Sequence, residues 1–523
     1  MGSMFLSAHI KRQKRVPLGS LRMVQLVVTL IGCCCPGFYT LASPPEMECQ
    51  TSVWQWSVPV VGMVSPETND PPRAFLYIPP TCVTVRGVII GQHNMLEEPI
   101  LEHAAVRQAM ADVSMAAVWV TPAFDGNFNF TKNPETPEIF QEMMDALAVV
   151  SGYAELSQTP VVWIGHSAMA KAPYHFAAWD AQHSEATGAP RRCAAGISVR
   201  GYYPTHASGD PVYEDSDLNG VPILYVEGEY ADADGRETQF LNLINANSNW
   251  IVSMFSDVGS GHFDWNARSS EYIAMYLRKL GQYRLPTIAD PDGTATLIEI
   301  DAGSKGWHAD RWRKGQVPTA APAPVASYAG NAAQAFWYFD QESAETVNDM
   351  YQIVKTDYQL LGYTQNGTLV DQTETHQQVN LSFIPDPDGD GRTFKLGTAF
   401  LDTVPSVSSR LTGWTGQPVG SEIGHASSGV PILISRICGP VEQLSPDTFR
   451  VRFDRVGLNN IYGQNRTRDI WLMAVHPGDD DYVAAVQQAL LRIPFPLTQG
   501  APQTIHFSEI DDQIVGANPI ELR

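Results

Sequence analysis

The sequence is poor in cysteine, and the few cysteines it has are spread widely. Only seven of its 523 residues are cysteines, and three of these lie side by side at positions 33–35. The other four have no pair spacing typical of a zinc site; they are Cys49, Cys82, Cys193 and Cys438. This scarcity excludes a disulfide-dense scaffold, although a bridge between Cys49 and Cys82 remains an alternative to buried free thiols.

Positive charge is also scarce. The chain has 34 lysines and arginines against 56 aspartates and glutamates, which gives a formal net charge of −22. So acidic a protein is a poor partner for nucleic acid or for an anionic membrane surface. Charged residues make up 17% of the chain and hydrophobic residues 44%, as in a globular protein with large cores. Its length predicts two or three domains.

Metal-binding motifs are missing apart from one partial match. Residues 386–391 begin like a calcium loop, with aspartates at alternate positions. An EF-hand would carry a glutamate at the twelfth position, where this chain has Gly397. The segment therefore predicts a hairpin turn, and the sequence predicts neither a metal site nor a cofactor.

The N-terminus, residues 1–42, predicts an export signal. A basic stretch from Lys11 to Arg15 precedes an apolar run over 23–31. Three alternatives remain open: cleavage after Ala42, a lipid on Cys33 in the lipobox-like stretch 30–33, and an uncleaved membrane anchor. The protein is expected to be secreted or held at the cell envelope, with membrane contact only through that lipid or anchor.

Residues 50–282 alternate between strand and helix patterns. Short apolar runs predict strands at 88–90, 116–122, 161–164, 194–199, 221–226 and 251–255. Amphipathic runs between them predict helices at 98–114, 137–152, 168–179, 237–245 and 270–280. This alternation indicates an α/β domain with a mostly parallel sheet flanked by helices.

Helical periodicity fades after residue 282. Residues 283–365 contain many aromatic side chains and are predicted to pack on the first domain as an extension. Residues 369–500 carry short β-prone runs, which predict an all-β, sandwich-like domain interrupted by one helix over 482–491. Residues 501–523 are interpreted as the start of an incomplete further repeat.

The stretch 161–170 organises the chemistry. A buried strand runs into Gly165-His166-Ser167-Ala168, and a helix follows. This is the setting of a G-x-S-x-G nucleophile elbow, although Met169 stands where the second glycine is usual. Ser167 is the predicted nucleophile. Its predicted base is His262, which follows the last strand of the domain.

A third residue must orient the histidine. In parallel-sheet hydrolases the acid lies between the serine and the histidine in chain order, after a strand of its own. Asp232 is the first candidate, Glu229 the alternative and Asp234 a weaker third. Asp257 lies close to His262 in sequence and is expected to be structural.

The tetrahedral intermediate needs two N–H donors for its oxyanion. The residue after the nucleophile, Ala168, is expected to supply one. The loop after the strand at 88–90 is expected to supply the other, from Gln92 or His93.

Residues 165–168, 228–229 and 261–263 together resemble motifs of the α/β-hydrolase superfamily, near dienelactone hydrolases and esterases. The resemblance covers residues 50–282 and implies a serine carboxylic-ester hydrolase that works through an acyl-enzyme. Its substrate would be a small-molecule or polymer ester, such as an acylated polysaccharide or a polyester. A non-catalytic surface-binding protein and a serine peptidase are the alternatives.

Residues 426–432 and 503–513 resemble phrases of Ig-like repeats in large secreted bacterial proteins. This second resemblance implies an Ig-like fold for the C-terminal part.

Overall fold

We describe the protein from a computed structural model. It describes residues 54–65, 71–122, 128–201, 204, 214–286, 296–372, 379–387, 389–405, 415–427, 429–452 and 469–494. The predicted export segment, Cys33, Cys49 and residues 501–523 lie outside these ranges. Within them, no helix is long and apolar enough to cross a membrane.

An eight-stranded sheet forms the first part, with strand order β1-β2-β4-β3-β5-β6-β7-β8. Its strands are β1 (Trp56–Pro59), β2 (Arg73–Tyr77), β3 (Gly87–Gln92), β4 (Met115–Thr121), β5 (Val161–His166), β6 (Cys193–Val199), β7 (Pro222–Gly228) and β8 (Ile251–Asp257). β1, β2 and β4 pair antiparallel, and all other neighbours pair parallel. The predicted α/β class with a mostly parallel sheet is therefore confirmed.

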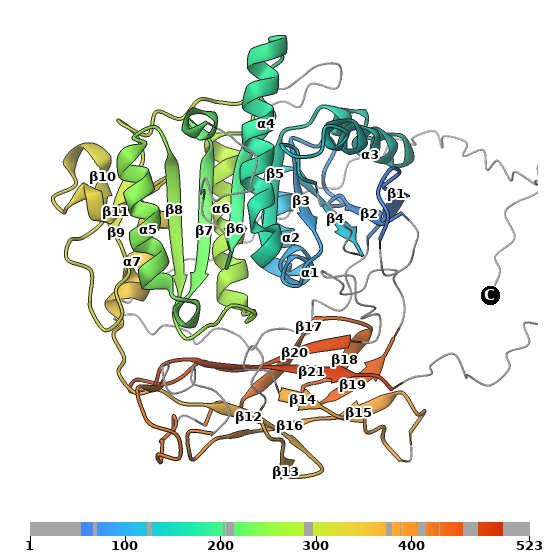
Figure 1. Ribbon diagram of the computed structural model, residues 1–523, viewed down its shortest axis with the longest axis vertical. Coiled ribbons are helices and arrows are strands. Elements are labelled where there is room, and N and C mark those ends of the chain that lie inside the picture. Colours follow the sequence, from blue (N-terminus) through green and yellow to red (C-terminus); the bar gives the residue numbers. More distant parts are fainter. Residues whose placement is uncertain are drawn as a thin grey trace, which may run out of the picture. The chain divides into compact units, whose positions relative to one another are not determined.

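Helices cover both faces of this sheet (Figure 1). They are α1 (Glu97–Glu102), α2 (Ala104–Val113), α3 (Thr136–Ser151), α4 (Ala172–Thr187), α5 (Ala233–Ala246) and α6 (Ala267–Tyr283). Single 3-10 turns lie between them: η2 (Ala154–Ser157), η3 (Ser167–Lys171), η4 (Asp215–Leu218) and η5 (Glu229–Ala231). The helix predicted over 98–114 is two helices, because His103 adopts extended backbone angles and its imidazole accepts the N–H of Ala105.

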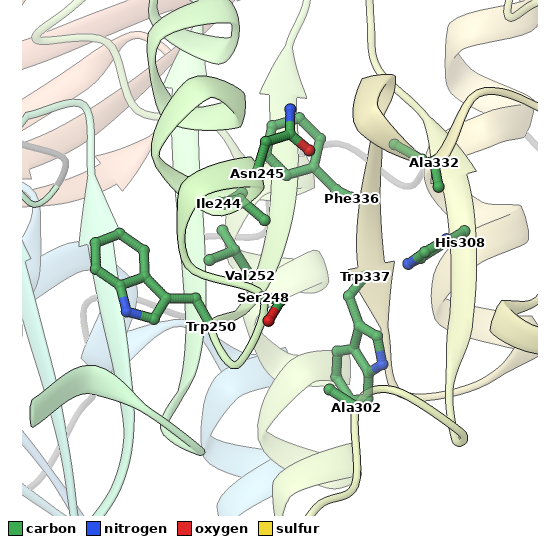
Figure 2. A pocket seen from close by; sticks show the side chains of 11 residues that line it. Ile244, Asn245, Ser248, Trp250, Val252, Ala302, His308, Ala332, Phe336 and Trp337 are labelled. Atoms are coloured by element: carbon green, nitrogen blue, oxygen red, sulfur yellow. The ribbon is translucent and has the colours of Figure 1, made fainter. Parts of the chain in front are cut away.

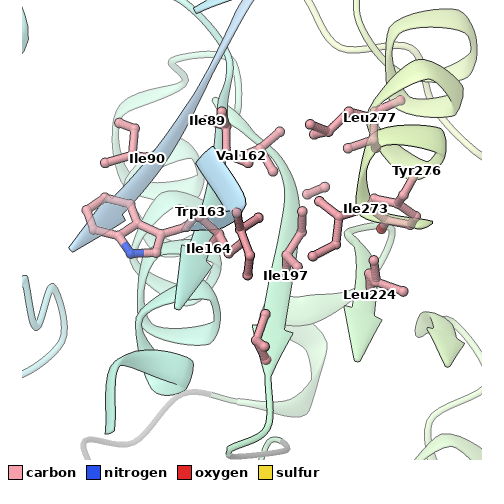
Figure 3. Close-up of a cluster of buried hydrophobic side chains, with 14 of the residues drawn as sticks. Ile89, Ile90, Val162, Trp163, Ile164, Ile197, Leu224, Ile273, Tyr276 and Leu277 are labelled. Atoms are coloured by element: carbon pink, nitrogen blue, oxygen red, sulfur yellow. The ribbon is translucent and has the colours of Figure 1, made fainter. Parts of the chain in front are cut away.

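The main core fills both faces of the sheet, and one of its layers lies between the sheet and α6. Figure 3 shows Ile273, Tyr276 and Leu277 of α6 facing the strands, with Trp163 on the other side of β5. Side chains of a strand alternate between its faces, and in-register neighbours share a face. Val162 and Ile164 accordingly lie on the opposite face of β5 from Trp163. All of these side chains are buried, so β5 is held between two apolar layers.

Residues 296–352 lie against β8. They form β9 (Trp307–Asp310), β10 (Ala323–Pro324), η6 (Val325–Ser327), η7 (Ala332–Gln334), β11 (Ala335–Tyr338) and α7 (Gln341–Gln352). Ser253 donates to the carbonyl of Trp337 at 2.7 Å, and Tyr338 donates to that of Met254 at 2.8 Å. The aromatic side chains of this segment thus join the core of the first part.

Small sheets make up the C-terminal part, as the all-β prediction requires. Their strands are β12 (Leu361–Gln365), β13 (Thr368–Leu369), β14 (Val379–Leu381), β15 (Thr393–Lys395), β16 (Gly397–Phe400), β17 (Leu433–Cys438), β18 (Val441–Ser445), β19 (Thr448–Val451), β20 (Asp469–His476) and β21 (Ala485–Arg492). They pair in the orders β13-β12-β16, β14-β21-β20-β17 and β15-β19-β18. All pairs are antiparallel except β14 with β21.

The helix predicted over 482–491 is wrong. This stretch contributes β21, which pairs with β20 along its whole length. β21 is buried on both faces, so its sequence lacks the polar alternation of a half-exposed strand. A short apolar run of this kind is ambiguous between helix and strand until its partners are known.

Two local predictions concern Cys82 and the segment 386–391. Cys82 is a buried free thiol whose Sγ lies 3.2 Å from the carbonyl of Thr84, and burial raises its pKa. The predicted hairpin turn at 386–391 is flanked by an antiparallel bridge between Pro385 and Phe394, and the N–H of Asp386 donates to the carbonyl of Thr393 at 2.7 Å. No group of three or more metal-ligating side chains occurs in the ranges given above.

Candidate active site

Ser167 lies at the tip of a sharp turn between β5 and η3. Its φ is +52°, in the left-handed region that side-chain-bearing residues rarely adopt. A Cβ on Gly165 would overlap the carbonyl oxygen of Met169, so this position requires glycine. The strained serine and the required glycine together give the geometry of a nucleophile elbow.

Met169 occupies the place of the usual second glycine without opening the turn. Its side chain is buried. The close approach on this side is made by Gly201, just beyond β6, where a Cβ would overlap the Cβ of Ala170 and approach the carbonyl oxygen of Ser167. The sequence interpretation missed Gly201, because nothing near it in the chain reveals that the elbow lies against it.

His262 lies in the loop after β8 and reaches the serine. Its Nε2 is 2.7 Å from Ser167 Oγ. Ser167 and His262 come from the carboxyl ends of β5 and β8, so the parallel sheet brings together residues 95 positions apart. At 2.7 Å from Ser167 Oγ, the imidazole of His262 can take the proton of the serine hydroxyl.

The backbone of the histidine loop is held on several sides. The N–H of Gly261 donates to Asp264 at 2.5 Å, and the N–H of Tyr230 donates to the carbonyl of Ser260 at 2.9 Å. Arg200, buried and with a φ of +47°, donates to the carbonyl of Gly261 and pairs with Asp257. Asp257 is therefore the ion-pair partner of Arg200, and a structural role was expected for it.

His166, the residue before the nucleophile, also touches this loop. Its Nε2 lies 2.9 Å from the carbonyl oxygen of His262. Because a carbonyl can only accept, this Nε2 carries the proton. Burial and the nearby His262 hold the pKa of His166 well below its usual range, so His166 stays neutral and serves as a donor.

The first two of the three candidate acids have different surroundings. The exposed Asp232 has a φ of +69° and places its carboxylate against Gly235 in the first turn of α5. Glu229 is buried and accepts the N–H of Gly259 at 3.0 Å and the hydroxyl of Tyr358 at 2.9 Å. Glu229 thus contacts the loop that carries the histidine, three residues before it.

The loop after β3 was expected to provide the second oxyanion donor. The N–H of His93 donates instead to the carbonyl of Val120 at 2.8 Å, as part of the sheet. This engagement corrects the His93 alternative, since a donor already paired within the sheet is not directed at a substrate. Gln92 is the last residue of β3 and accepts the N–H of Phe128 through its side chain. Ala168 is the second residue of η3, directly after the nucleophile, and its role as an oxyanion donor stays a prediction.

A buried glutamate joins this loop to the elbow. Glu97 Oε1 accepts the N–H of His166 at 2.6 Å, and its Oε2 accepts the N–H groups of Asn94 and Met95 at 2.9 Å each. Asn94 in turn donates to the carbonyl of His166 at 2.6 Å. Burial raises the pKa of Glu97 to about 7 despite the three N–H donors. The sequence interpretation missed Glu97; the only signal was a pair of acidic residues soon after a buried strand.

One cavity of about 200 Å³ lies elsewhere, between the end of α5, the start of β8 and the strands β9 and β11 (Figure 2). Trp250 and Trp337 line it with His308, Asn245 and Ser248. None of the predicted site residues is among its walls.

No protein-family model matches the chain, and no curated protein matches it. Among solved structures it is similar to an esterase from Pyrobaculum calidifontis, at 13% identity and a TM-score of 0.29, over 45% of this chain and 87% of that one. It is also similar to a thermophilic carboxylesterase cloned from a metagenomic library, at 14% identity and a TM-score of 0.30, over 44% of this chain and 91% of that one. A third similar structure, a predicted hydrolase from Thermoplasma acidophilum, has 12% identity and a TM-score of 0.27, over 40% of this chain and 93% of that one.

Proposed function

We propose that this protein is a serine carboxylic-ester hydrolase in which Ser167 is the nucleophile and His262 the base. The observation that carries the proposal is the 2.7 Å separation of Ser167 Oγ and His262 Nε2 at a turn where the serine has a φ of +52°. A strained serine aimed at an imidazole, at the carboxyl edge of a parallel sheet, is the arrangement that acyl transfer requires. The similar solved structures include an esterase and a carboxylesterase.

In the first half of the reaction Ser167 Oγ attacks the ester carbonyl carbon, and His262 Nε2 takes its proton. The carbonyl oxygen becomes an oxyanion, for which the N–H of Ala168 and a donor at Gln92 are the proposed partners. The carbon–oxygen bond of the ester breaks, and His262 passes the proton to the departing alcohol. The acyl group remains on Ser167.

In the second half water attacks the acyl-enzyme with His262 again as base. The acid product leaves and Ser167 regains its proton. Asp232 and Glu229 are both kept as candidates for the residue that orients the imidazole. Burial and contact with the histidine loop favour Glu229, whereas Asp232 is kept because a turn after Gly228 could aim it at His262.

The substrate class and the site of action are proposed by analogy with the resemblances found in the sequence. Acylated polysaccharides or polyesters are proposed as substrates, and export through residues 1–42 as the route to them. A serine peptidase would use the same two residues, and a binding protein would use neither for turnover.

The test is hydrolysis of p-nitrophenyl acetate and butyrate by the full chain and by Ser167→Ala. We expect the variant to lose about 10³-fold or more in kcat, because no other group supplies the nucleophile. Ser248→Ala, an exposed serine at the cavity of Figure 2, is the matched control and should keep full activity. Equal activity in wild type and Ser167→Ala, or none in either, would refute the proposal; cleavage confined to peptide amides would assign a peptidase.

The acid is assigned by Glu229→Gln and Asp232→Asn in the same assay. Loss of the orienting carboxylate is expected to lower kcat by about 10⁴-fold, as when the acid of a serine triad becomes an amide. The other variant should stay within about tenfold of wild type.

A further inference from the structure

The C-terminal strands share the apolar core of the first part. Side chains from three of these strands belong to the same buried cluster as the sheet strands β3 to β8; they are Ile437, Cys438, Trp471, Met473 and Val486. Interiors are close-packed, so a shared cluster couples the two parts mechanically. An appended module that only tethers an enzyme to a surface needs no such contact.

One residue of β21 touches both loops of the candidate active site. Gln488 Nε2 donates to the carbonyl of Phe263 at 3.0 Å and lies 3.9 Å from Met95 Sδ. Phe263 directly follows His262, and Met95 belongs to the loop that Glu97 ties to the elbow. Gln488 is only 2% exposed, so this amide has left water to make these contacts.

The start of the histidine loop also lies against the C-terminal part. Gly259 has a φ of +80°, and a Cβ there would overlap the carbonyl oxygen of Ala484, just before β21. Tyr358, which leads into β12, donates to Glu229 beneath the same loop. The loop that carries the base is therefore bounded by residues from beyond position 355.

A buried ion pair fixes the other loop. Arg436 of β17 lies 2.7 Å from Glu98 and 3.9 Å from Glu102, both on α1, which begins two residues after Met95. Their side chains are at most 9% exposed. Burial alone would lower the pKa of Arg436, because it disfavours the charged guanidinium. The carboxylates of Glu98 and Glu102 outweigh this effect and raise the pKa above its ordinary value, so Arg436 stays charged.

We propose that the C-terminal β part is a wall of the active site, and that Gln488 is a positioning residue for the His262 loop. The catalytic meaning of this proposal rests on the proposed function. Its hydrogen bond to the carbonyl of Phe263 holds the His262 loop in position relative to Ser167. Its contact with Met95 holds the same loop at a fixed distance from the loop after β3. Loss of the hydrogen bond is expected to lower kcat and to leave KM nearly unchanged, since Gln488 acts on the reacting groups and not on the substrate.

The experiment compares Gln488→Met with Gln487→Met in the full chain. Both remove a buried amide of similar size from neighbouring positions of β21. Gln487 bonds within the C-terminal part, to Gln372 and to the carbonyl of Gln488. We expect Gln488→Met to lose about 10- to 100-fold in kcat, as misplaced catalytic groups do, and Gln487→Met to match wild type. Gln488→Glu, compared with wild type at the same pH, should come closer to wild-type kcat as the pH falls, because only its protonated carboxyl group can donate to the carbonyl of Phe263.

A second readout separates this proposal from the proposed function. Amide hydrogen exchange of peptides covering 259–265 and 93–98 needs no turnover. These peptides should exchange faster in Gln488→Met and at the wild-type rate in Gln487→Met. Wild-type kcat and exchange in Gln488→Met would overturn the positioning role even if Ser167-dependent hydrolysis is established. Faster exchange in an enzyme without such hydrolysis would support the role and refute only the ester hydrolase.

Discussion

Glu97 gives the sharpest test of how the elbow is held. Its carboxylate is wholly buried and accepts three backbone N–H groups, from His166, Asn94 and Met95. Glu97→Gln keeps the size but replaces one acceptor oxygen by an NH₂ group. If the amide oxygen stays on Asn94 and Met95, the NH₂ faces the N–H of His166, and a buried donor is left unpaired. Such a loss costs about 1–3 kcal/mol of stability.

The same substitution removes a titration, and the sign of its pH dependence can be worked out. Burial raises the pKa of Glu97 to about 7 in the folded protein, against 4.5 as its ordinary value. The folded state therefore binds the proton more tightly, and wild-type stability from this group falls as pH rises from 4.5 to 7. At 1.36 kcal/mol per pKa unit, wild type loses roughly 2–3 kcal/mol between pH 5 and pH 8, a loss that Glu97→Gln does not suffer.

The assay is urea unfolding at pH 5 and pH 8. Glu97→Gln should be less stable than wild type at pH 5, and the deficit should shrink or reverse at pH 8. Glu142→Gln, an exposed position on α3, is the matched control and should differ from wild type equally at both pH values. A deficit of Glu97→Gln that is the same at pH 5 and pH 8 would refute the account of this carboxylate.

Two further substitutions probe the elbow and the ion pair. Gly201→Ala places a Cβ against Ala170 and the carbonyl of Ser167, so we expect kcat to fall about 10-fold or more, while Gly429→Ala, whose Cβ would meet open space, keeps wild-type kinetics. Arg436→Met removes the guanidinium that pairs with the buried Glu98 and Glu102. It should cost about 3–5 kcal/mol in unfolding free energy, of which the added change Glu98→Gln restores part. Full stability of Arg436→Met would show that water reaches this pair.

The sequence predicted features that depend on neighbours in the chain. Buried runs such as 161–164 and 251–255 marked the strands, and the order of the strand ends then brought Ser167 and His262 together. The turn after β5 was visible because Gly165 precedes the serine. These predictions succeed because strand burial and parallel topology leave few arrangements of the chain.

What the sequence missed depends on contacts between distant segments. Gly201 matters only because η3 lies against it, and Glu97 only because three N–H groups converge on it. The pattern of residues 482–491 predicts a helix where the structure has β21, because burial on both faces hides the alternation of a strand. Gln488 has no local signal at all, since its role comes from a loop 225 residues away.

The shared cluster of apolar side chains also has a consequence for folding cooperativity. Val486 and Met473 contribute to the same interior as the sheet strands. Borders drawn along the sequence near residue 369 therefore need not be borders between units that melt independently. Heat should unfold the sheet and the C-terminal strands in one transition. The C-terminal part could then not be removed or exchanged without unfolding the part that carries the proposed active site.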